Sequence, residues 1–575
     1  DHIDRIRRDI YTLRDYLRQQ DIAHSVAHGT FSVNGRLTLE TLEKLMLLFD
    51  VFEGMNGARD ILFSQVWQAT LMNLSPESID RLYNKYAIEP FGFRPWIKGF
   101  TGGSDDHSGI FIANSYTTST ADTREGFLES LKSRETRAAG RCNDFKSFAF
   151  SIYKITYEFT RHKTAGNTLN MLNAVSALLF DSPDPERRQV AFFEQFRRDE
   201  RNRLVSRFVD DLLTDLLNNK NLGFEHKIDR IYHNVAMLFD EYCIVLLRSF
   251  AGDVRSGNLA EILKNISSSL PVIFLSAPFF TSIRHLSSNR KLLMDLRKKY
   301  LASNGNDEKA VLWFTDTITD LNGVCITLHD LLRTARRQER KLKIVVSKPD
   351  GIDIDGRRDD IVNLKTIYSY TSPQYPSYTV QVPSLLKAIE EIYFNWPDEI
   401  IVSTPGPVGV LGLIAARLLG VPCKAIYHTD FTEHMRLVSG DEALMEVTEN
   451  YLKWFYSLFD EILVPTGRYL EELCERDFDP STMRTFKRGV DTSLFHFDPD
   501  RYQEMADEAP LRGGFNLVWS GRVCRDKNLA YLFDLYQELV RQYPETNLFI
   551  VGDGPSYQEY RQMMERHERV VFTGR

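Results

Sequence analysis

The chain has few cysteines and lacks the positive charge excess of nucleic-acid-binding proteins. Its six cysteines are scattered over 575 residues without a Cys-x-x-Cys pair. This pattern argues against a disulfide framework or a zinc ribbon and favours free thiols in a reducing compartment. The net charge is −8, with 71 Lys and Arg against 79 Asp and Glu, so we expect no nucleic-acid partner.

The sequence also shows no secretory signal, tandem repeat or membrane-spanning segment. The run SSLPVIFLSAPFF (Ser268–Phe280) is apolar, but it is short and interrupted by prolines. A basic amphipathic run, RHLSSNRKLLMDLRKKY, follows it. The pair could rest on an anionic membrane surface, but a core segment with a solvated helix face is the favoured interpretation. We therefore expect a cytoplasmic protein, with peripheral contact at the inner face of the membrane as the alternative.

Two strand-like runs near the C-terminus flank a basic segment, SGRVCRDKN (Ser520–Asn528). Apolar runs of this kind are typical of buried parallel strands, whose carboxyl ends form the ligand-binding edge of a sheet. Arg522 and Lys527 are therefore expected at that edge, where two cations can grip a diphosphate. The other interpretation is a solvated surface pair, since most charged side chains are simply exposed.

A second segment points to the same chemistry. Trp313–Leu328 reads WFTDTITDLNGVCITL, an apolar strand followed by a polar turn and a helix. The turn contains Asn322 and Gly323. A glycine there lets backbone N–H groups approach a phosphate at a helix N-terminus, which favours negative charge.

Six motifs occur in one order: TDTITDLNGV, IYHTDF, VPTGRYLEEL, FKRGVDTSLF, SGRVCRDKN and VGDGP. Together they resemble the family 4 retaining glycosyltransferases of GT-B fold, especially lipid-directed and mannosyl-type members, over roughly Lys309–Arg575. The resemblance implies two Rossmann-like domains and transfer of a hexose, with retention at the anomeric carbon. The donor would be a nucleotide diphosphate sugar and the acceptor a carbohydrate or lipid. No metal or other cofactor is implied for this part.

The resemblance also implies roles for single residues. Arg522 and Lys527 would act on the donor diphosphate, and the Asn322–Gly323 turn would bring its backbone against the same phosphates. The acceptor would dock near Gly323 and the loop Pro405–Gly409.

Three further residues belong to the same expected site. His428 would lie near the transferred sugar, although a buried structural histidine is the alternative. Gly552 and Gly554 would form a tight turn beside the nucleotide. The family carries a glutamate pair, seven residues apart, beyond the point where this sequence ends at Arg575. We therefore expect the donor-side domain to be incomplete.

The N-terminal region carries a different pattern. Asp105 and His107 lie in the polar loop FTGGSDDHSG, with Asp106 as an adjacent candidate, and their spacing suits one metal ion. Together with His28 this arrangement resembles the C-terminal half of a PHP (polymerase and histidinol phosphatase) domain, over residues 1–160. The resemblance implies divalent zinc, manganese or iron, and hydrolysis of phosphate esters. The alternative is a polar turn with incidental histidines.

The expected architecture is a multidomain α/β protein. A partial PHP-like α/β barrel at 1–160 is followed by a helical linker region at 161–306. The two Rossmann-like domains follow at 307–490, on the acceptor side, and 491–575, on the donor side and truncated. The leading hypothesis is a glycosyltransferase; a phosphoesterase whose transferase part only binds nucleotide, or a scaffold with both parts degenerate, are the alternatives.

Overall fold

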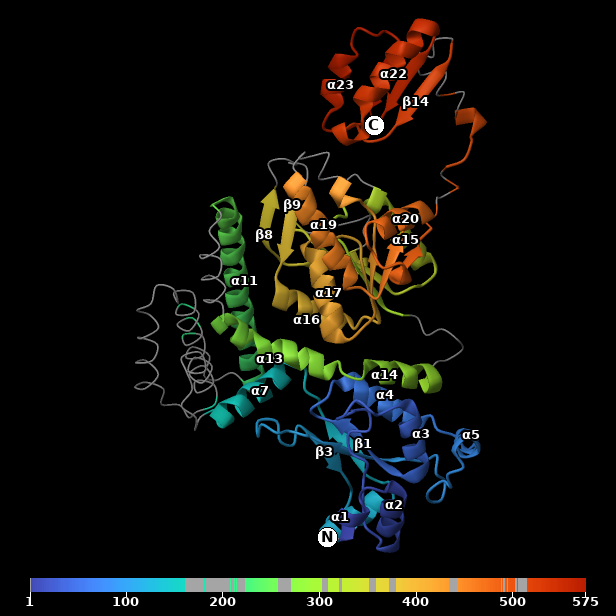
Figure 1. The fold of residues 1–575 in the computed structure, drawn as a ribbon. Helices are drawn as coiled ribbons and strands as arrows, with labels where there is room; N and C mark the ends of the chain where they lie inside the picture. Colours follow the sequence, from blue (N-terminus) through green and yellow to red (C-terminus); the bar gives the residue numbers. More distant parts are fainter. Residues whose placement is uncertain are drawn as a thin grey trace.

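The computed structural model arranges the chain as an N-terminal unit, a layer of helices, a large parallel sheet and a small C-terminal sheet (Figure 1). Helices α7 (Phe145–Thr160), α13 (Leu270–Leu286) and α14 (Arg290–Leu296) lie between the N-terminal unit and the large sheet. Apart from a few isolated positions, the structure describes residues 2–160, 223–256, 270–301, 309–319, 323–350, 358–371, 379–433, 442–487, 495–501 and 514–574.

The N-terminal unit is built on short strands. Strands β1 (Val51–Asn56) and β2 (Gly99–Gly103) pair in parallel, and Val26 forms a parallel bridge to Phe52. Strands β3 (Ser115–Thr118) and β4 (Arg137–Gly140) pair antiparallel. The described strands of residues 2–160 form these two small sheets and no closed barrel, so the PHP-like barrel remains a prediction. The helices are α1 (His2–Ile6), α2 (Ile10–Gln19), α3 (Leu39–Leu48), α4 (Ile61–Met72), α5 (Pro76–Tyr86) and α6 (Arg124–Lys132).

Long helices follow the N-terminal unit. They are α7 (Phe145–Thr160), α11 (Phe224–Ser256), α13 (Leu270–Leu286), α14 (Arg290–Leu296) and the π-helical turn η2 (Arg297–Leu301). The apolar side of α13 is buried, with Leu275, Phe279 and Ile283 each at most 1% exposed. The described part of the apolar segment is therefore a core helix. None of the described helices is long and apolar enough to cross a bilayer.

These helices share a core with the large sheet. One apolar cluster contains buried residues of α7, α11, α13 and the sheet. The Tyr232 hydroxyl of α11 donates to the carbonyl oxygen of Leu386 at 2.8 Å, and Phe145 of α7 packs against Tyr232. The described helices thus pack on the sheet unit as well as connecting it to the N-terminal unit.

The large sheet contains seven parallel strands among the described residues, in the order β13-β12-β11-β10-β5-β6-β7. Chain order reverses between β5 and β10, which is the doubly wound arrangement of Rossmann-like domains. Strands buried on both faces explain the apolar sequence runs. The strands are β5 (Val311–Phe314), β6 (Leu342–Ser347), β7 (Ile361–Leu364), β10 (Glu399–Val402), β11 (Cys423–Ile426), β12 (Glu461–Val464) and β13 (Met483–Thr485).

Helices cover both faces of this sheet (Figure 1). A hairpin of β8 (Thr366–Thr371) and β9 (Thr379–Pro383) lies beside it. The helices are α15 (Gly323–Arg337), α16 (Leu385–Asn395), α17 (Pro407–Leu419), α19 (Glu442–Ser457) and α20 (Gly467–Glu475), with the short turns η3 (Arg358–Asp360) and η4 (Pro480–Thr482).

The C-terminal unit, residues 514–574, is a second parallel sheet with strand order β14-β15-β16. Its core contains Phe533 of α22 and Ile550 of β15. The elements are β14 (Asn516–Ser520), the turn η5 (Arg525–Lys527), α22 (Leu529–Gln542), β15 (Asn547–Val551), α23 (Tyr557–Met563) and β16 (Val570–Gly574).

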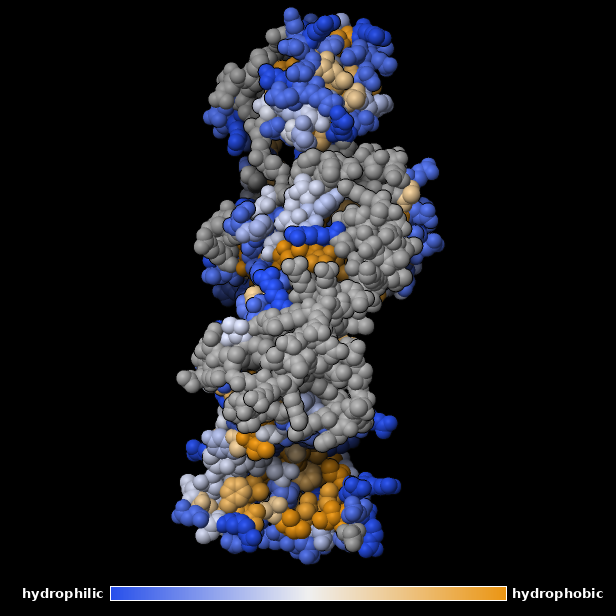
Figure 2. Space-filling model, turned by 90° about the vertical axis from the view of Figure 1, so that its left-hand side faces the viewer, coloured by the Kyte–Doolittle hydropathy of each residue, from blue (hydrophilic) through white to orange (hydrophobic). Residues whose placement is uncertain are grey.

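Apolar side chains also gather on the surface of the N-terminal unit, at the lower end of the molecule in Figure 2. Exposed apolar residues of this unit include Phe93, Ile112 and Tyr116. Surface patches of this kind are common at interfaces with other molecules.

Candidate functional site

The strand order of the large sheet defines where a ligand would bind. Strands β5 and β10 are neighbours, and the chain winds away from them in opposite directions. The loops after such strands diverge and leave a crevice at the carboxyl ends. Thr315 and Asp316 follow β5, and Ser403 and Thr404 follow β10.

Asp316 anchors the N-terminus of α17, the helix that begins at this crevice. The Thr404 hydroxyl donates to its Oδ2 at 2.5 Å, and the Val408 N–H donates to Oδ1 at 2.9 Å. Burial raises the pKa of Asp316 above its ordinary value, and these hydrogen bonds offset only part of the rise. A Cβ on Gly406 would lie 2.5 Å from Oδ2 of Asp316. The glycine in the predicted acceptor loop is therefore needed for this close approach, whatever the ligand.

His428 lies where the sequence predicts, on the loop after β11. The residue is half-buried, and its Nε2 lies 3.1 Å from the Ser403 hydroxyl. Ser403 in turn accepts a hydrogen bond from Trp313 Nε1 at 2.5 Å. His428 thus belongs to the same strand-end crevice as β5 and β10.

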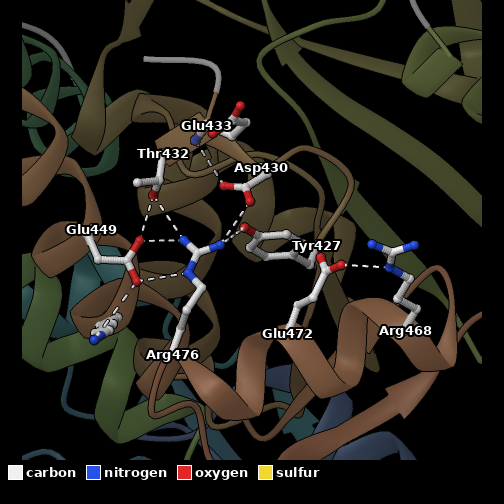
Figure 3. Close-up of polar contacts among 9 residues, drawn as sticks. Tyr427, Asp430, Thr432, Glu433, Glu449, Arg468, Glu472 and Arg476 are labelled. Carbon is white, nitrogen blue, oxygen red and sulfur yellow. Dashed lines mark hydrogen bonds and ion pairs between the residues drawn. The ribbon is translucent and has the colours of Figure 1, made fainter. Parts of the chain in front are cut away.

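The loop that carries His428 is held by Arg476, which follows α20 (Figure 3). Arg476 Nη1 donates to Asp430 Oδ2 at 2.9 Å and Nη2 donates to Thr432 Oγ1 at 3.0 Å. The guanidinium also binds the Glu449 carboxylate of α19, and Nη1 lies 3.4 Å from the Tyr427 hydroxyl. The network thus binds side chains on both sides of His428 in the sequence.

The predicted phosphate turn is partly described. Gly323 is the first residue of α15, and a Cβ built on it would meet no atom within 4 Å. Nothing in the described fold therefore requires glycine at this position, which leaves room for a ligand. Asn322 lies outside the described residues.

A groove of about 1100 Å³ lies along α15 and the segment after β13. Its lining combines the apolar Ile326 and Phe495 with the cationic Arg333, Arg336 and Lys487. On α15 its lining begins at Ile326, one turn after Gly323.

Arg522 and Lys527 both follow β14 of the C-terminal sheet. Arg522 is half-buried, and its Nε donates to Cys524 Sγ at 3.4 Å. Lys527 is exposed at the end of the turn η5. Both cations thus lie beyond the carboxyl end of their strand, on a different unit from His428 and Gly323.

Close backbone contacts explain why glycine is needed at two positions after β15. Gly552 has φ +139°, and a Cβ there would collide with the carbonyl oxygen of Gly521. A Cβ on Gly554 would collide with the carbonyl oxygen of Val523. The close approach of the loops after β14 and β15 explains both glycines, and their predicted contact with a nucleotide remains a prediction.

The N-terminal candidates also gather at one sheet edge. The His28 N–H donates to Glu53 Oε2 at 2.5 Å, and Asn56 Nδ2 donates to both Glu53 Oε2, at 3.0 Å, and Asp105 Oδ2, at 3.1 Å. His107 Nδ1 lies 3.9 Å from Asp105 Oδ1, with 78% of its side chain exposed. His28 and Asp105 have positive φ, of 34° and 47°. Strained backbone of this kind clusters at functional sites.

A buried arginine, Arg59, interacts electrostatically with the carboxylates of this edge. Burial lowers the pKa of Arg59 to about 10, while Asp105 and Glu53 raise it. Burial, and then Arg59, lower the pKa of His285 of α13 to about 4. The described residues include no group of three or more His, Cys, Asp or Glu that could hold a metal ion. As arranged, these side chains do not form a ligand set, and the metal assignment stays a prediction that metal analysis would test.

Several residues of the two sites are not apparent from the sequence. Ser403 and Thr404 could have been predicted only from their position directly after an apolar strand. Arg476 and His285 come from helices distant in sequence from the residues they contact, so no spacing reveals them.

Comparison with known proteins gives a family match. Residues 321–494 match the family described as Glycosyltransferase Family 4, which confirms the predicted resemblance for that part of the chain. A GDP-mannose-dependent alpha-mannosyltransferase from Corynebacterium glutamicum is 28% identical over 199 residues, 34% of this chain and 44% of the relative. One from Mycobacterium tuberculosis is 28% identical over 261 residues, 45% of this chain and 65% of the relative.

A sulfoquinovosyl transferase from Arabidopsis thaliana is 26% identical over 239 residues, 40% of this chain and 44% of the relative. The chain thus spans about half the length of the curated relatives it matches. Among solved structures, Anabaena HepE in complex with UDP-glucose aligns with TM-score 0.35 and 16% identity, over 46% of this chain and 69% of that one.

Proposed function

We propose that the chain is a glycosyltransferase that moves a hexose from a nucleotide diphosphate sugar to an acceptor. The observation that carries the proposal is the position of the family match. Residues 321–494 include the His428 loop and the first helix after β5, and they surround the switch point of a doubly wound sheet. This is the place where sheets of this class bind ligands.

The donor side of the proposal rests on charge. Arg522 and Lys527 follow the same strand end, and two cations there match the charge of a diphosphate. They would stabilise the negative charge that develops on the departing nucleotide. His428 would contact the transferred sugar. Retention of anomeric configuration is the finer part of the proposal and is supported by the resemblance alone.

The acceptor side rests on the groove along α15. Apolar and cationic side chains line it together. Such a lining suits an acceptor with an apolar body and an anionic head, whether a lipid or a substituted carbohydrate. Domain closure over the crevice would exclude water during transfer.

The proposal is tested with purified chain and a donor panel of GDP-mannose, UDP-glucose and UDP-galactose. Lipid extracts and oligosaccharides serve as acceptors, released GDP or UDP is measured, and product anomers are assigned by NMR. Donor binding is measured separately by calorimetry. Turnover that depends on one donor, with an anomer of the donor's configuration, is the expected result.

Single-residue variants test the role of the two cations, with a third variant as control. Lys527→Ala and Arg522→Ala should abolish transfer while the fold is retained. Arg541→Ala removes an exposed cation from the last turn of α22 in the same unit and should leave transfer unchanged. Absence of both binding and turnover across the panel, or unchanged turnover in Lys527→Ala, would contradict the proposal.

A further inference from the structure

The outer face of α15 carries a basic stripe. The helix buries Leu328 and Leu332, which are 0% and 2% exposed, in the core of the large sheet. On the opposite face Ile326, Arg333 and Arg337 follow at spacings of seven and four residues, which places their side chains in one row along an α-helix. All three are exposed, Ile326 by 63%. This row borders the groove along α15.

The groove gathers positive charge. Its lining includes four cationic side chains, Arg333, Arg336, Arg337 and Lys487. Asp330 is the one carboxylate among its described lining residues, and it lies 3.4 Å from Arg333 at the surface. The lining thus has a clear excess of positive charge, on a chain whose net charge is −8. A partner attracted to this face is therefore anionic.

Aromatic side chains lie beside these cations. Phe495 lines the groove and is 69% exposed, and Phe497, two residues further on, is 77% exposed. Exposed apolar side chains next to arginines suit the boundary between lipid headgroups and acyl chains, where apolar groups insert and cations meet phosphates. A soluble polyanion would pair with the arginines but leave the apolar side chains in water. The combination favours a lipid surface.

We propose that this face binds the surface of an anionic phospholipid membrane. The α15 surface, as we call it, consists of Ile326, Arg333, Arg336, Arg337, Lys487 and Phe495. Its cations would lie among the lipid phosphates, while the isoleucine and phenylalanine reach the acyl boundary. Adsorption of this kind needs neither a donor nor turnover, so the inference does not depend on the proposed transferase function.

The α15 surface differs from the membrane contact that the sequence offers. The apolar part of that segment, at Ser268–Phe280, is a core helix in its described portion, since Leu275 and Phe279 are at most 1% exposed. In the basic run that follows, Lys299 binds the buried Glu43. A membrane contact therefore fits α15 better than this segment.

Vesicle binding of the full chain tests the proposal. The chain is mixed with phosphatidylcholine vesicles, with and without phosphatidylglycerol, and the bound fraction is measured by co-sedimentation at a series of salt concentrations. We expect binding only to vesicles that contain phosphatidylglycerol, with an affinity that falls as salt rises, because salt screens exposed charges. Absence of binding, or equal binding to both kinds of vesicle, overturns the proposal.

A charge variant locates the contact. Arg333→Gln combined with Arg337→Gln should lower the vesicle partition coefficient by about 25-fold, because each cation near an anionic surface contributes about fivefold. Arg541→Gln combined with Arg561→Gln is the matched control, since it removes the same charge from exposed positions on α22 and α23. Equal losses in the two double variants would reflect net charge alone and overturn the assignment to α15.

An aromatic variant separates a membrane from other anionic partners. Phe495→Ser should lower vesicle binding by about tenfold or more, because it removes apolar surface that inserts into the lipid boundary. Phe515→Ser is the control, at a side chain that is 67% exposed on the C-terminal unit. Unchanged vesicle binding in Phe495→Ser overturns the insertion of this side chain. Binding to poly-glutamate without binding to anionic vesicles would assign the surface to an acidic protein and overturn the membrane proposal.

Discussion

Arg476 and Glu449 form a two-bonded ion pair between the end of α20 and α19. Arg476 Nε donates to Glu449 Oε1 at 3.0 Å, and Nη2 donates to Oε2. The two side chains are 24% and 20% exposed. Because Nη1 also binds Asp430, the pair holds the His428 loop against two helices (Figure 3).

Replacing Arg476 by lysine should weaken this network. An ammonium cannot reproduce the planar fork that binds Glu449, Asp430 and Thr432 together. We expect Arg476→Lys to lower the free energy of unfolding by about 1–2 kcal/mol, measured by urea denaturation. It should also lower kcat, because the His428 loop loses its anchor.

Arg468 supplies the control for this prediction. It pairs with Glu472 on the outer side of α20 at 2.9 Å, and 86% of its side chain is exposed. Exposed pairs contribute little, so Arg468→Lys should change stability by less than about 0.5 kcal/mol. Equal effects of the two substitutions would contradict a special role for Arg476.

Glu43 should govern part of the acid stability of the N-terminal unit. Its side chain is fully buried. Burial opposes its ionisation, yet hydrogen bonds from Lys299, Tyr86, Lys85 and Tyr300 lower its pKa to about 2. A carboxylate with a depressed pKa stabilises the fold above its unfolded pKa and loses that contribution as pH falls through the folded value.

Glu43→Gln should therefore lower the free energy of unfolding at pH 7. It should also remove roughly 3 kcal/mol of the stability that wild type loses as pH falls from about 4.5 to about 2. Urea unfolding at a series of pH values measures both effects. Glu40→Gln is the control, since Glu40 is exposed on the same helix and pairs with Lys44 at the surface. Parallel curves of unfolding free energy against pH for wild type and Glu43→Gln would refute the lowered pKa of Glu43.

A buried hydrogen bond joins the N-terminal unit to the large sheet. The Tyr393 hydroxyl of α16 donates to Asp60, the N-cap of α4. Arg290 donates to the carbonyl oxygen of Pro397 at 2.7 Å and lies 3.9 Å from the ring centre of Trp396. Because these contacts join the N-terminal unit to the large sheet, the stability of each unit depends on the other.

Tyr393→Phe should cost about 1–3 kcal/mol, because the Asp60 carboxylate loses a buried donor. Scanning calorimetry is the measurement, and the N-terminal transition should move to lower temperature. Tyr543→Phe removes a hydroxyl from a side chain that is 61% exposed and should leave the transitions unchanged. A shift no larger than that of the control would show that the contact is energetically neutral.

The sequence predicts the sheet edges well, because apolar runs and glycine turns mark where parallel strands end. His428 after β11 and Arg522 after β14 both lie at such ends. The partners of these residues are less predictable. Arg476 is 27 residues from Glu449 and 46 from Asp430, and only packing of α19 and α20 brings them together.

The glycines after β15 show a second limit of the sequence. Gly552 reads as a nucleotide contact in the sequence, but a Cβ there meets the Gly521 carbonyl oxygen. The sequence records that a position must be glycine and does not record whether a ligand or the protein's own backbone requires it. The packing of the loops after β14 and β15 supplies that distinction.

Alanine at two glycines tests this distinction directly. Gly552→Ala should destabilise the C-terminal unit by about 2 kcal/mol or more, because its φ of +139° disfavours any side chain and the Cβ collides with backbone. Gly323→Ala should leave stability unchanged or slightly raised, since its Cβ would meet open space at the start of a helix. Thermal melts of both variants make the comparison.

Ligand binding then separates the two roles of glycine. If the turn before α15 brings its backbone against a phosphate, the methyl group of Gly323→Ala occupies that space, and affinity for the nucleotide sugar should fall while the melting temperature does not. Gly323→Ser adds a hydroxyl in the same place and should behave alike. Full affinity in a stable Gly323→Ala would mean that the phosphates do not approach this turn, and the donor or acceptor phosphate would then have to be sought at another helix N-terminus of the crevice.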